Sequence, residues 1–502
     1  LSPFFELSSN NYLTMWNCSS PHVTDFQGLY KHGIIGLNTR QFALSNPQDE
    51  VYKYRNTMKL TNTLIENCRA PEKALELRKV KDRTSIEVIE RYQRLLKENA
   101  DPNEWAFAWR TELNRGGFPA YELLNELVVN PGKCIGCAAC VSICPVDVFD
   151  YVDEKPVDTR ADACVNCVLC AEVCPVLRPA DNDMQEFIDL QQPTVDEGYG
   201  PYSYGLYARS TDQEIMEKCQ DGGIVSAIIL HQMEKGALKG AVLGDVYPDN
   251  RQVGLHKLAR NREEVLNCAA SRYTYSPNTL ALQEAMQQDI GPIAVVGVPC
   301  QIDGVRLQQN SSIRLNISTW YRKNITLTFG LFCSESFSNE SISKLGEIIE
   351  EDPTTIENIN IKGKVIIRLE NKEVKTVSLK RYREWARPAC LYCLDYGAEN
   401  ADIGAGGIGL DGWTYTLIRT KRGHEAFQAA LADGWLETRP LSDEPRGEFL
   451  MNMLSANKKK NRPLPSLMPT HEEREAMGSL CPKTFYTTGP GAPKVDDKGD
   501  RE

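Results

Sequence analysis

Cysteine is the residue type whose spacing most directly predicts chemistry in this chain. The motif C-x2-C-x2-C-x3-C-P occurs twice in close succession, with its ligand candidates at Cys134, Cys137, Cys140, Cys144, Cys164, Cys167, Cys170 and Cys174. Three thiolates at this spacing fit around one face of a 4Fe–4S cluster, and the fourth ligates the neighbouring cluster. The spacing therefore predicts one cluster held by Cys134, Cys137, Cys140 and Cys174, and a second held by Cys164, Cys167, Cys170 and Cys144. Structural zinc, the alternative, favours two separated C-x2-C pairs.

A second group of cysteines follows later in the chain. Cys300 and Cys333 each close an apolar run that is typical of a strand, and Cys390 and Cys393 form a C-x2-C pair. A pair joined by two cysteines at strand ends can close around a third 4Fe–4S cluster, because cofactors bind at the strand ends of open α/β sheets. Buried free thiols and a zinc-bound pair remain open as alternatives. The candidates to replace one of these ligands are Cys219 and Cys268.

Two glycine-rich segments accompany these cysteines. Gly404 to Gly409 matches G-x-G-x-x-G by letter, but a strand rather than a helix is expected after it, so we expect a tight loop that approaches a ligand. Gln220 to Gly223 opens a helix at Ile224, and the free N–H groups of a helix N-terminus favour phosphate or an electron-rich ring edge.

The elements that position these residues indicate four segments. Residues 1–125 form an N-terminal extension with helical character between Thr57 and Arg115, 126–180 a ferredoxin-type domain, 200–440 an α/β domain, and 441–502 a C-terminal tail. The α/β domain is expected to contain strands at Gly240–Val246, Ile293–Val298, Ile325–Phe332, Val365–Leu369 and Thr414–Ile418. Its helices are expected at Gly223–Glu234, Thr279–Gln288 and Ser341–Glu350.

Composition limits the classes of function. The formal charge of −11 argues against a nucleic-acid partner, which usually meets a basic face. No apolar run approaches the roughly 18 residues that span a bilayer. Seventeen cysteines, eight of them in cluster motifs, imply reducing conditions, so we expect a cytoplasmic, oxygen-poor setting.

Seven ordered motifs in the α/β region resemble one known family. They are QDGG (Gln220–Gly223), SRYTYSP (Ser271–Pro277), VPCQIDG (Val298–Gly304), GLFCSE (Gly330–Glu335), RPACLYC (Arg387–Cys393), ADIGAGGIG (Ala401–Gly409) and GW-x5-RT-x2-G (Gly412–Gly423). The set resembles the beta subunit of coenzyme F420-reducing hydrogenase, whose wider family includes the input subunit of F420H2 dehydrogenase, the beta subunits of formate dehydrogenases and plant 7-hydroxymethyl chlorophyll a reductase. The resemblance covers about 200–440, and the two-cluster module is a known companion of this domain.

The resemblance implies cofactors and ligands for this chain. A third 4Fe–4S cluster would be held by Cys300, Cys333, Cys390 and Cys393. FAD would lie near Gln220, Asp221, Gly222, Gly223, Ser271, Arg272, Tyr273, Pro299 and Gln301, with Asp402, Gly404 and Gly406 lining its pocket. The basic residues Lys362, Lys364, Lys380, Arg381 and Arg387 would meet the anionic tail of coenzyme F420, unless they form an ordinary solvated surface.

The resemblance also implies a reaction. A deazaflavin exchanges hydride, clusters carry single electrons, and FAD can do both, so FAD would stand between them. We expect an F420-oxidoreductase subunit, with no catalytic side chain named, in a complex of the hydrogenase, formate dehydrogenase, carbon monoxide dehydrogenase or formylmethanofuran dehydrogenase type. The extension and the tail would dock this partner. The alternatives are a ferredoxin-dependent flavin reductase of another substrate, and a non-catalytic electron-conducting subunit.

Overall fold

The computed structural model describes residues 120–177 and 195–461, apart from 131, 166, 197, 249, 311–315, 388 and 391–392. The helices expected between Thr57 and Arg115 and the last forty-one residues of the tail, 462–502, lie outside the described residues. In the described part, no helix is long and apolar enough to cross a membrane.

The ferredoxin-type domain repeats its cysteine motif in three dimensions. Helices α10 (Ala139–Ile143) and α11 (Leu169–Glu172) each begin after a residue in the left-handed conformation, Ala138 or Val168, that follows the second cysteine of its motif. The domain also contains β1 (Asp150–Val152), β2 (Lys155–Val157), η1 (Asn125–Val129) and η2 (Ala161–Ala163). Helix α9 (Ala120–Leu124) packs against α11, so the domain includes residues that the sequence assigns to the extension.

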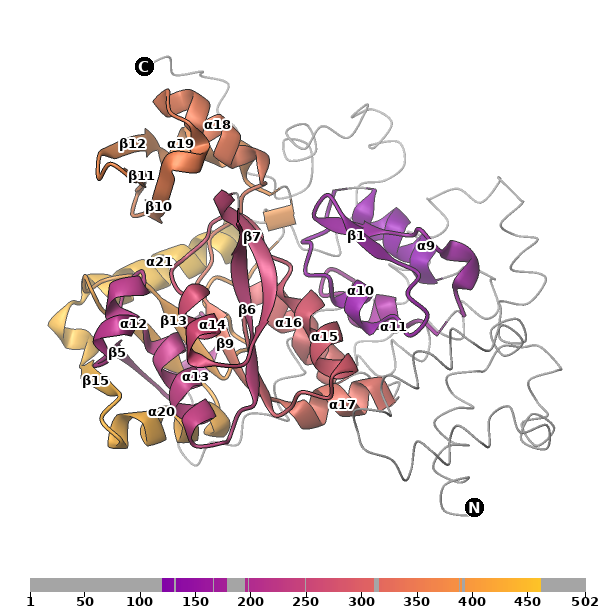
Figure 1. Ribbon diagram of the computed structural model, residues 1–502, viewed down its shortest axis with the longest axis horizontal. Coiled ribbons are helices and arrows are strands. Elements are labelled where there is room, and N and C mark those ends of the chain that lie inside the picture. Colours follow the sequence, from indigo (N-terminus) through magenta and orange to yellow (C-terminus); the bar gives the residue numbers. More distant parts are fainter. Residues whose placement is uncertain are drawn as a thin grey trace.

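An eight-stranded sheet forms the centre of the α/β domain (Figure 1). Its order is β15 (Leu436–Arg439), β5 (Tyr204–Ser210), β14 (Thr414–Ile418), β13 (Ile403–Gly406), β9 (Ile325–Leu331), β8 (Ile293–Gly297), β6 (Gly240–Tyr247) and β7 (Asn250–Ala259). The four strands β13, β9, β8 and β6 run parallel, and antiparallel strands flank them on both sides. The carboxyl ends of these parallel strands therefore meet at one edge of the sheet.

Helices cover both faces of this sheet, and alternation along the strands divides their side chains between two cores. Ala241 and Leu243 of β6 join a core with α13 (Ile224–Glu234), α14 (Arg262–Asn267) and α20 (Lys421–Ala432). Val242, on the other face, joins a core with α15 (Ala281–Gln287), α16 (Pro299–Gln309) and α17 (Asn316–Asn324). The second core continues into the ferredoxin-type domain, whose helix α10 contacts α16.

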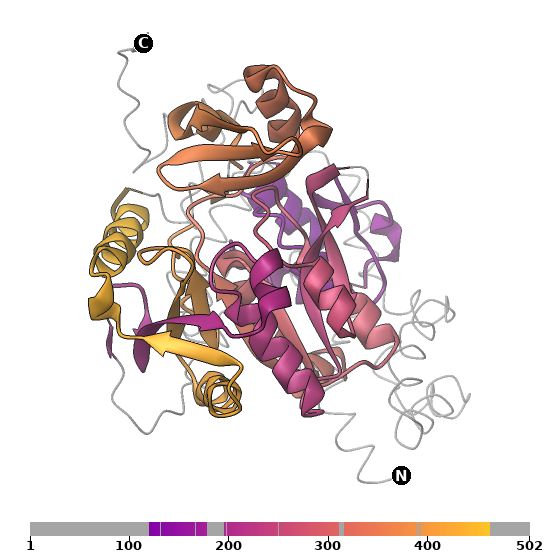
Figure 2. The ribbon, with the colours of Figure 1, turned by 60° about the vertical axis from the view of Figure 1, so that its left-hand side comes forward.

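A small lobe lies at the top of Figures 1 and 2, and Gln252 of β7 in the central sheet donates to its Ile356 carbonyl at 3.2 Å. It consists of the sheet β10 (Ile356–Ile361), β11 (Lys364–Leu369) and β12 (Val374–Ser378) with α18 (Glu340–Ile349) and α19 (Leu379–Tyr382) around its own core. The strand expected at Val365–Leu369 exists as β11. It belongs to this lobe rather than to the main sheet.

Two expectations about the end of the α/β domain are corrected by the structure. Residues 446–461 form helix α21 (Arg446–Asn461), and its Met451 is fully buried against the aromatic side chains Tyr199, Tyr207 and Tyr415. The domain therefore extends past 440 into the expected tail. The glycine-rich segment 404–406 is not a loop, because Gly404 and Gly406 pair with β14 as part of β13.

Candidate functional site

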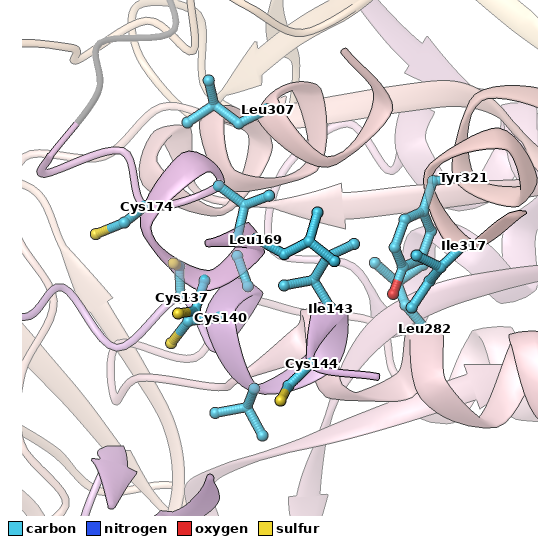
Figure 3. Packing of buried hydrophobic residues seen from close by; sticks show 14 of the residues in the cluster. Cys137, Cys140, Ile143, Cys144, Leu169, Cys174, Leu282, Leu307, Ile317 and Tyr321 are labelled. Carbon is cyan, nitrogen blue, oxygen red and sulfur yellow. The ribbon is translucent and has the colours of Figure 1, made fainter. Parts of the chain in front are cut away.

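Four cysteines of the ferredoxin-type domain, Cys134, Cys137, Cys140 and Cys174, line one cavity. Burial raises the pKa of the Cys140 thiol, and the neighbouring Cys137, Cys134 and Cys174 raise it further. These four cysteines share a cavity otherwise lined by apolar groups, namely Leu124, Val128, Val129, Ile135, Ala138, Pro156 and Val176. Figure 3 shows Cys137 and Cys140 next to each other, with Cys174 to one side of them and Cys144 to the other.

The second set lies around α11. Burial, followed by the charges of Cys167, Cys164 and Cys144, raises the pKa of the Cys170 thiol. Backbone N–H groups already point at sulfur atoms of both sets, since Gly136 donates to Cys134 at 3.4 Å and Val148 donates to Cys144 at 3.3 Å. Such N–H···S contacts are the means by which proteins tune iron–sulfur clusters, so this donor set fits two clusters.

The third set assembles where β8 and β9 end. Cys300 lies in the first turn of α16 directly after β8, and Cys333 follows β9. Burial raises the pKa of the Cys300 thiol well above its usual value, and Cys393, Cys137, Cys333 and Cys390 add to the effect. The structure thus brings together the four cysteines named from the sequence, at the strand ends where cofactors bind.

The two cysteines considered as replacements lie in other surroundings. Cys219 donates from its Sγ to the carbonyl of Asp221 at 2.9 Å, beside the QDGG loop. Cys268 ends α14, and burial raises its pKa to about 12. In the described ranges, no three His, Cys, Asp or Glu side chains converge closely enough for a single metal ion. A 4Fe–4S cluster does not require this convergence, because each iron takes its own thiolate.

A buried lysine from the C-terminal helix completes the third set. Lys458 of α21 is 3% exposed, and its Nζ donates to Cys393 Sγ at 3.2 Å and to the Asp395 carbonyl at 3.0 Å. Burial alone would lower the pKa of Lys458, but Cys393, Cys333 and Cys390 outweigh it and hold the pKa above its ordinary value. Sequence reasoning missed this residue, because it lies in the run Lys458–Lys460, which is typical of a solvated surface.

The QDGG loop connects α12 (Gln213–Lys218) to α13 and packs on the main sheet. A Cβ at Gly222 would lie 2.4 Å from the Ala208 carbonyl oxygen, so only glycine fits there. Its N–H donates to Thr414 Oγ1 at 3.1 Å. Gly223 begins α13 with φ of +67°, a conformation that glycine adopts without strain. The loop therefore presents the N-terminus of α13 beside β5 and β14.

Asp221 joins the two glycine-rich segments. A Cβ at Gly407, just beyond β13, would lie 1.9 Å from Asp221 Oδ2, so the carboxylate occupies the space that this glycine leaves. Burial raises the pKa of Asp221, and Lys362, 3.7 Å away, opposes that shift. The ammonium of Lys362 is also 2.6 Å from Asp411. Lys362 therefore already faces two carboxylates beside the QDGG loop.

The small lobe closes over the loop. Asn358 of β10 donates to Gln220 Oε1 at 3.1 Å, and the N–H of Ile361 donates to the Tyr273 hydroxyl at 3.2 Å. Burial raises the pKa of Tyr273 to about 12, and the charges of both Asp221 and Cys333 act on this hydroxyl. The Tyr273 carbonyl accepts from the N–H of Phe337 at 2.9 Å, and the N–H of the neighbouring Ser336 donates to Cys390 Sγ at 3.3 Å, so Tyr273 connects the small lobe to the third cysteine set.

Other expected cofactor residues serve the scaffold around Tyr273. Arg272 donates to the carbonyls of Ala269 and Ala270, which shapes the loop that carries Ser271. Gln301 accepts from the Val298 N–H at 3.0 Å and donates to the Ser276 carbonyl, while Pro299 opens α16. These contacts hold Cys300 in place. Lys364, Lys380 and Arg381 are exposed.

Of the three residues expected to line a flavin pocket, Asp402 and Gly404 are buried and Gly406 is half-buried. Asp402 is fully buried, and its carboxylate accepts from Thr328 and Thr420 and pairs with Arg306 at 3.1 Å. Both carboxylate oxygens of Asp402 therefore accept from groups within the protein core. Cβ atoms at Gly404 and Gly406 would lie 3.1 and 2.3 Å from the Phe332 ring, so both glycines make room for that side chain.

Arg387 also differs from expectation. The basic side chain expected at the deazaflavin tail is 7% exposed, and its guanidinium carbon lies 4.5 Å from the centre of the Tyr275 ring. Its Nη2 donates to the carbonyl of Glu154 in the ferredoxin-type domain. Arg387 is therefore an interdomain residue in this structure, because burial removes it from any surface tail.

Three models of known protein families match this chain. Two family models describe the N-terminal and C-terminal parts of the beta subunit of coenzyme F420 hydrogenase/dehydrogenase. The N-terminal model matches residues 206–283, and the C-terminal model matches residues 291–444. A "4Fe-4S dicluster domain" model matches 133–177.

Similar proteins come from methanogens. The chain is 34% identical over 284 residues to the beta subunit of coenzyme F420 hydrogenase from Methanosarcina barkeri, covering 56% of this chain and 94% of that protein. It is 31% identical to one subunit of the F(420)H(2) dehydrogenase of Methanosarcina mazei, covering 60% of this chain and 83% of that protein. It is 32% identical to the coenzyme F420-dependent sulfite reductase of Methanocaldococcus jannaschii, covering 61% of this chain but only 47% of that protein.

A solved structure shows the same similarity. A chain of the F420-reducing [NiFe] hydrogenase complex from Methanosarcina barkeri is 33% identical and superposes with a TM-score of 0.50, covering 53% of this chain and 91% of that chain. The chain described here therefore belongs to the family of coenzyme F420 hydrogenase/dehydrogenase beta subunits, and a 4Fe–4S dicluster domain precedes its two family domains.

Proposed function

We propose that this chain is the F420-oxidoreductase subunit of a larger complex, and that it passes electrons between coenzyme F420 and a partner's iron–sulfur clusters through FAD. The observation that carries the proposal is the position of Tyr273. Its hydroxyl accepts from Ile361 of the lobe strand whose Asn358 donates to Gln220 in the QDGG loop. Its carbonyl accepts from the N–H of Phe337 at 2.9 Å, and the N–H of the neighbouring Ser336 donates to Cys390 Sγ of the third cysteine set at 3.3 Å. A flavin bound at that loop would therefore lie next to the third cluster. The relatives named for F420 chemistry supply the substrate.

The cysteines fit three 4Fe–4S clusters. We assign the first to Cys134, Cys137, Cys140 and Cys174, the second to Cys144, Cys164, Cys167 and Cys170, and the third to Cys300, Cys333, Cys390 and Cys393. The eight thiols of the ferredoxin-type domain lie in or against one apolar core, and charge from members of the same set acts on Cys140, Cys170 and Cys300. FAD, when bound, supplies the exchange between hydride on a deazaflavin and single electrons on clusters.

Residues around the QDGG loop would bind and orient the flavin and the anionic substrate. The first N–H groups of α13, which follow Gly222 and Gly223, can donate to an anionic or electron-rich group. Asn358 and Ile361 fasten the small lobe to Gln220 and Tyr273. Lys362 supplies positive charge beside the QDGG loop. An anionic substrate would compete with the Asp411 carboxylate for the Lys362 ammonium. Hydride transfer requires no side-chain acid or base, and we name none.

The partner is proposed to be of the hydrogenase type, because the similar solved structure belongs to such a complex. Residues 1–119 precede the dicluster core and are proposed to dock this partner. Because α9 packs in that core, the deletion that tests docking must end at residue 119 and leave Ala120 onward intact. Loss of co-purification with retained flavin activity is expected. Loss of flavin activity with retained association would contradict the docking role.

The central experiment is an anaerobic spectrum of the purified chain with iron and flavin quantified, followed by titration with F420H2. We expect about twelve irons and one FAD per chain, and bleaching when F420H2 is added. A matched pair of variants sharpens the result. Cys333→Ser should lose roughly one cluster of four irons, whereas Cys268→Ser, at a thiol outside the three sets, should lose none.

The remaining outcomes identify the alternatives. FAD that does not bleach with F420H2 would indicate a ferredoxin-dependent reductase of another substrate. About eight irons and no flavin would indicate a two-cluster electron-conducting subunit.

A further inference from the structure

The ferredoxin-type domain is fastened to the α/β domain by a row of side-chain donors. Four carbonyl groups around α10 accept from the α/β domain: that of Cys137 from Thr279, that of Ala139 from Gln308 at 3.0 Å, that of Val141 from Gln283 at 3.0 Å and that of Ser142 from Tyr321 at 3.1 Å. Thr279, Gln308 and Tyr321 are fully buried. Breaking such an interface would leave buried carbonyls without donors, so the two domains form one fixed unit.

This interface brings the first and third cysteine sets together. Gly304 lies one helical turn after Cys300 on α16, and a Cβ placed there would be 3.6 Å from Cys137 Sγ and 3.0 Å from Ala139 Cβ. The helix that carries one ligand of the third set therefore touches one ligand of the first. In agreement, the charge of Cys137 contributes to the raised pKa of Cys300.

Arg387 crosses the same junction from the other side. Its Nη1 is 3.4 Å from the Glu154 carboxylate, and its Nη2 would lie 2.6 Å from a Cβ on Gly136, inside the loop between Cys134 and Cys137. On the α/β side, its carbonyl accepts from the N–H of Cys390 at 3.0 Å. A single residue thus contacts the cysteine loops of both sets.

Two buried donors at this junction lack a protein partner. The Nε of Arg387 and the hydroxyl of Tyr275 make no hydrogen bond to any described residue. The Tyr275 hydroxyl lies within electrostatic range of Cys300 and Cys137, and the Arg387 guanidinium stacks on the Tyr275 ring. Buried donors of this kind cost free energy unless something accepts from them, and the sulfur atoms of bound clusters would be acceptors.

We propose that Arg387 is a positioning residue that locks the loop of the first ferredoxin cluster against the third cluster and places one permanent positive charge between them. The inference rests on the proposed assignment of both clusters. A cation stabilises the reduced, more negative form of a nearby cluster, so it raises the reduction potentials of both. Lysine is a poor substitute, because only the planar guanidinium stacks on Tyr275 while donating to Glu154.

The test is an anaerobic redox titration of the full-length protein, with the clusters followed by electron paramagnetic resonance. Arg387→Met removes the charge, Arg387→Lys keeps it without the planar fork, and Glu154→Gln removes the negative partner. Arg368→Met, which removes a charge that is 52% exposed on the small lobe, is the control. Hydrogen exchange of residues 134–138 reports the docking of the loop in each variant.

Arg387→Met should shift the one-electron reduction equilibrium of the first and third clusters about tenfold toward the oxidised form, which lowers each reduction potential by about 59 mV. The reduction potential of the second cluster should not change. Glu154→Gln should shift both potentials in the opposite direction. Arg387→Lys should leave the reduction potentials of both clusters close to those of the wild type, but the backbone amides of residues 134–138 should exchange hydrogen faster. If Arg387→Met misfolds, two other variants still test the proposal. Glu154→Gln should raise both reduction potentials, and Arg387→Lys should keep the potentials while hydrogen exchange at 134–138 becomes faster.

Unchanged potentials in Arg387→Met, an equal shift of all three clusters, or a shift of one cluster alone would overturn the inference. A purely structural role would raise hydrogen exchange and leave the potentials in place. The proposed function is judged separately in the same samples, by FAD content and by bleaching with F420H2. If the wild-type protein holds no FAD and does not bleach with F420H2, the F420 assignment is refuted. If Arg387→Met still shifts both reduction potentials, the role proposed for Arg387 is retained.

Discussion

The Nζ of Lys458 lies 3.2 Å from the Sγ of Cys393, although 65 residues separate the two in the chain. A buried ammonium that donates to a ligand sulfur favours the reduced form of a cluster, and charged hydrogen bonds contribute roughly 1.5–3 kcal/mol. Lys458→Met should therefore lower the potential of the third cluster by on the order of 60–120 mV, measured by redox titration. Lys459→Met is the control, because Lys459 is 38% exposed and pairs with Glu399 instead. Equal shifts in the two variants would contradict the assignment.

Asp402 is expected to govern stability rather than flavin binding. Asp402→Asn leaves Arg306, which is fully buried, without its counter-charge. Removing one partner of a buried ion pair costs roughly 3–5 kcal/mol, so denaturant unfolding should show a loss of that size. Asp411→Asn, at a carboxylate 90% exposed, should change stability little. A variant Asp402→Asn with wild-type stability but no flavin would restore the pocket-lining role.

Gly407 is expected to be essential for the flavin loop. Gly407→Ala places a methyl group where the Asp221 carboxylate lies, so that side chain must leave its position beside Lys362. Loss of an oriented charged contact should weaken flavin retention by about tenfold or more, measured by equilibrium dialysis. Gly236→Asn is a suitable control, because a side chain there meets nothing within 4 Å. Unaltered flavin affinity in Gly407→Ala would separate Asp221 from the flavin site.

Glu399 should make the stability of the domain depend on pH. Burial, followed by repulsion from Asp395, raises the pKa of Glu399 from 4.5 to about 7. Because the folded state holds this proton more tightly than the unfolded state, the stabilisation is fully present below pH 4.5 and is lost as the pH rises through 7. Glu399→Gln should remove this part of the pH dependence in denaturant unfolding, measured from about pH 5 to about pH 8. An unchanged profile would show that Glu399 does not titrate in that range.

Strands with continuous apolar runs could be predicted from the sequence, and strands with polar or glycine-rich sequences could not. The expected runs correspond to β6, β8, β9 and β14, whose residues are largely buried. Strand β7 begins with three polar residues and contains a glycine, and β13 consists of Ile403, Gly404, Ala405 and Gly406, so neither carries that signal. Tertiary packing overrides weak local preference at both strands, since β13 is held between β9 and β14.

The sequence by itself determined what depends on short spacing. The C-x2-C-x2-C-x3-C-P motifs predict crossed cysteine sets because neighbouring thiols within one loop have few ways to point, and the family motifs identify the α/β domain. Only the tertiary structure decided which distant groups surround those thiols. Arg387 and Glu154 are 233 residues apart, and their contact exists because α10 packs against α16. The residues that flank a charged side chain in the sequence do not predict whether it will be buried, because burial depends on the assembled core.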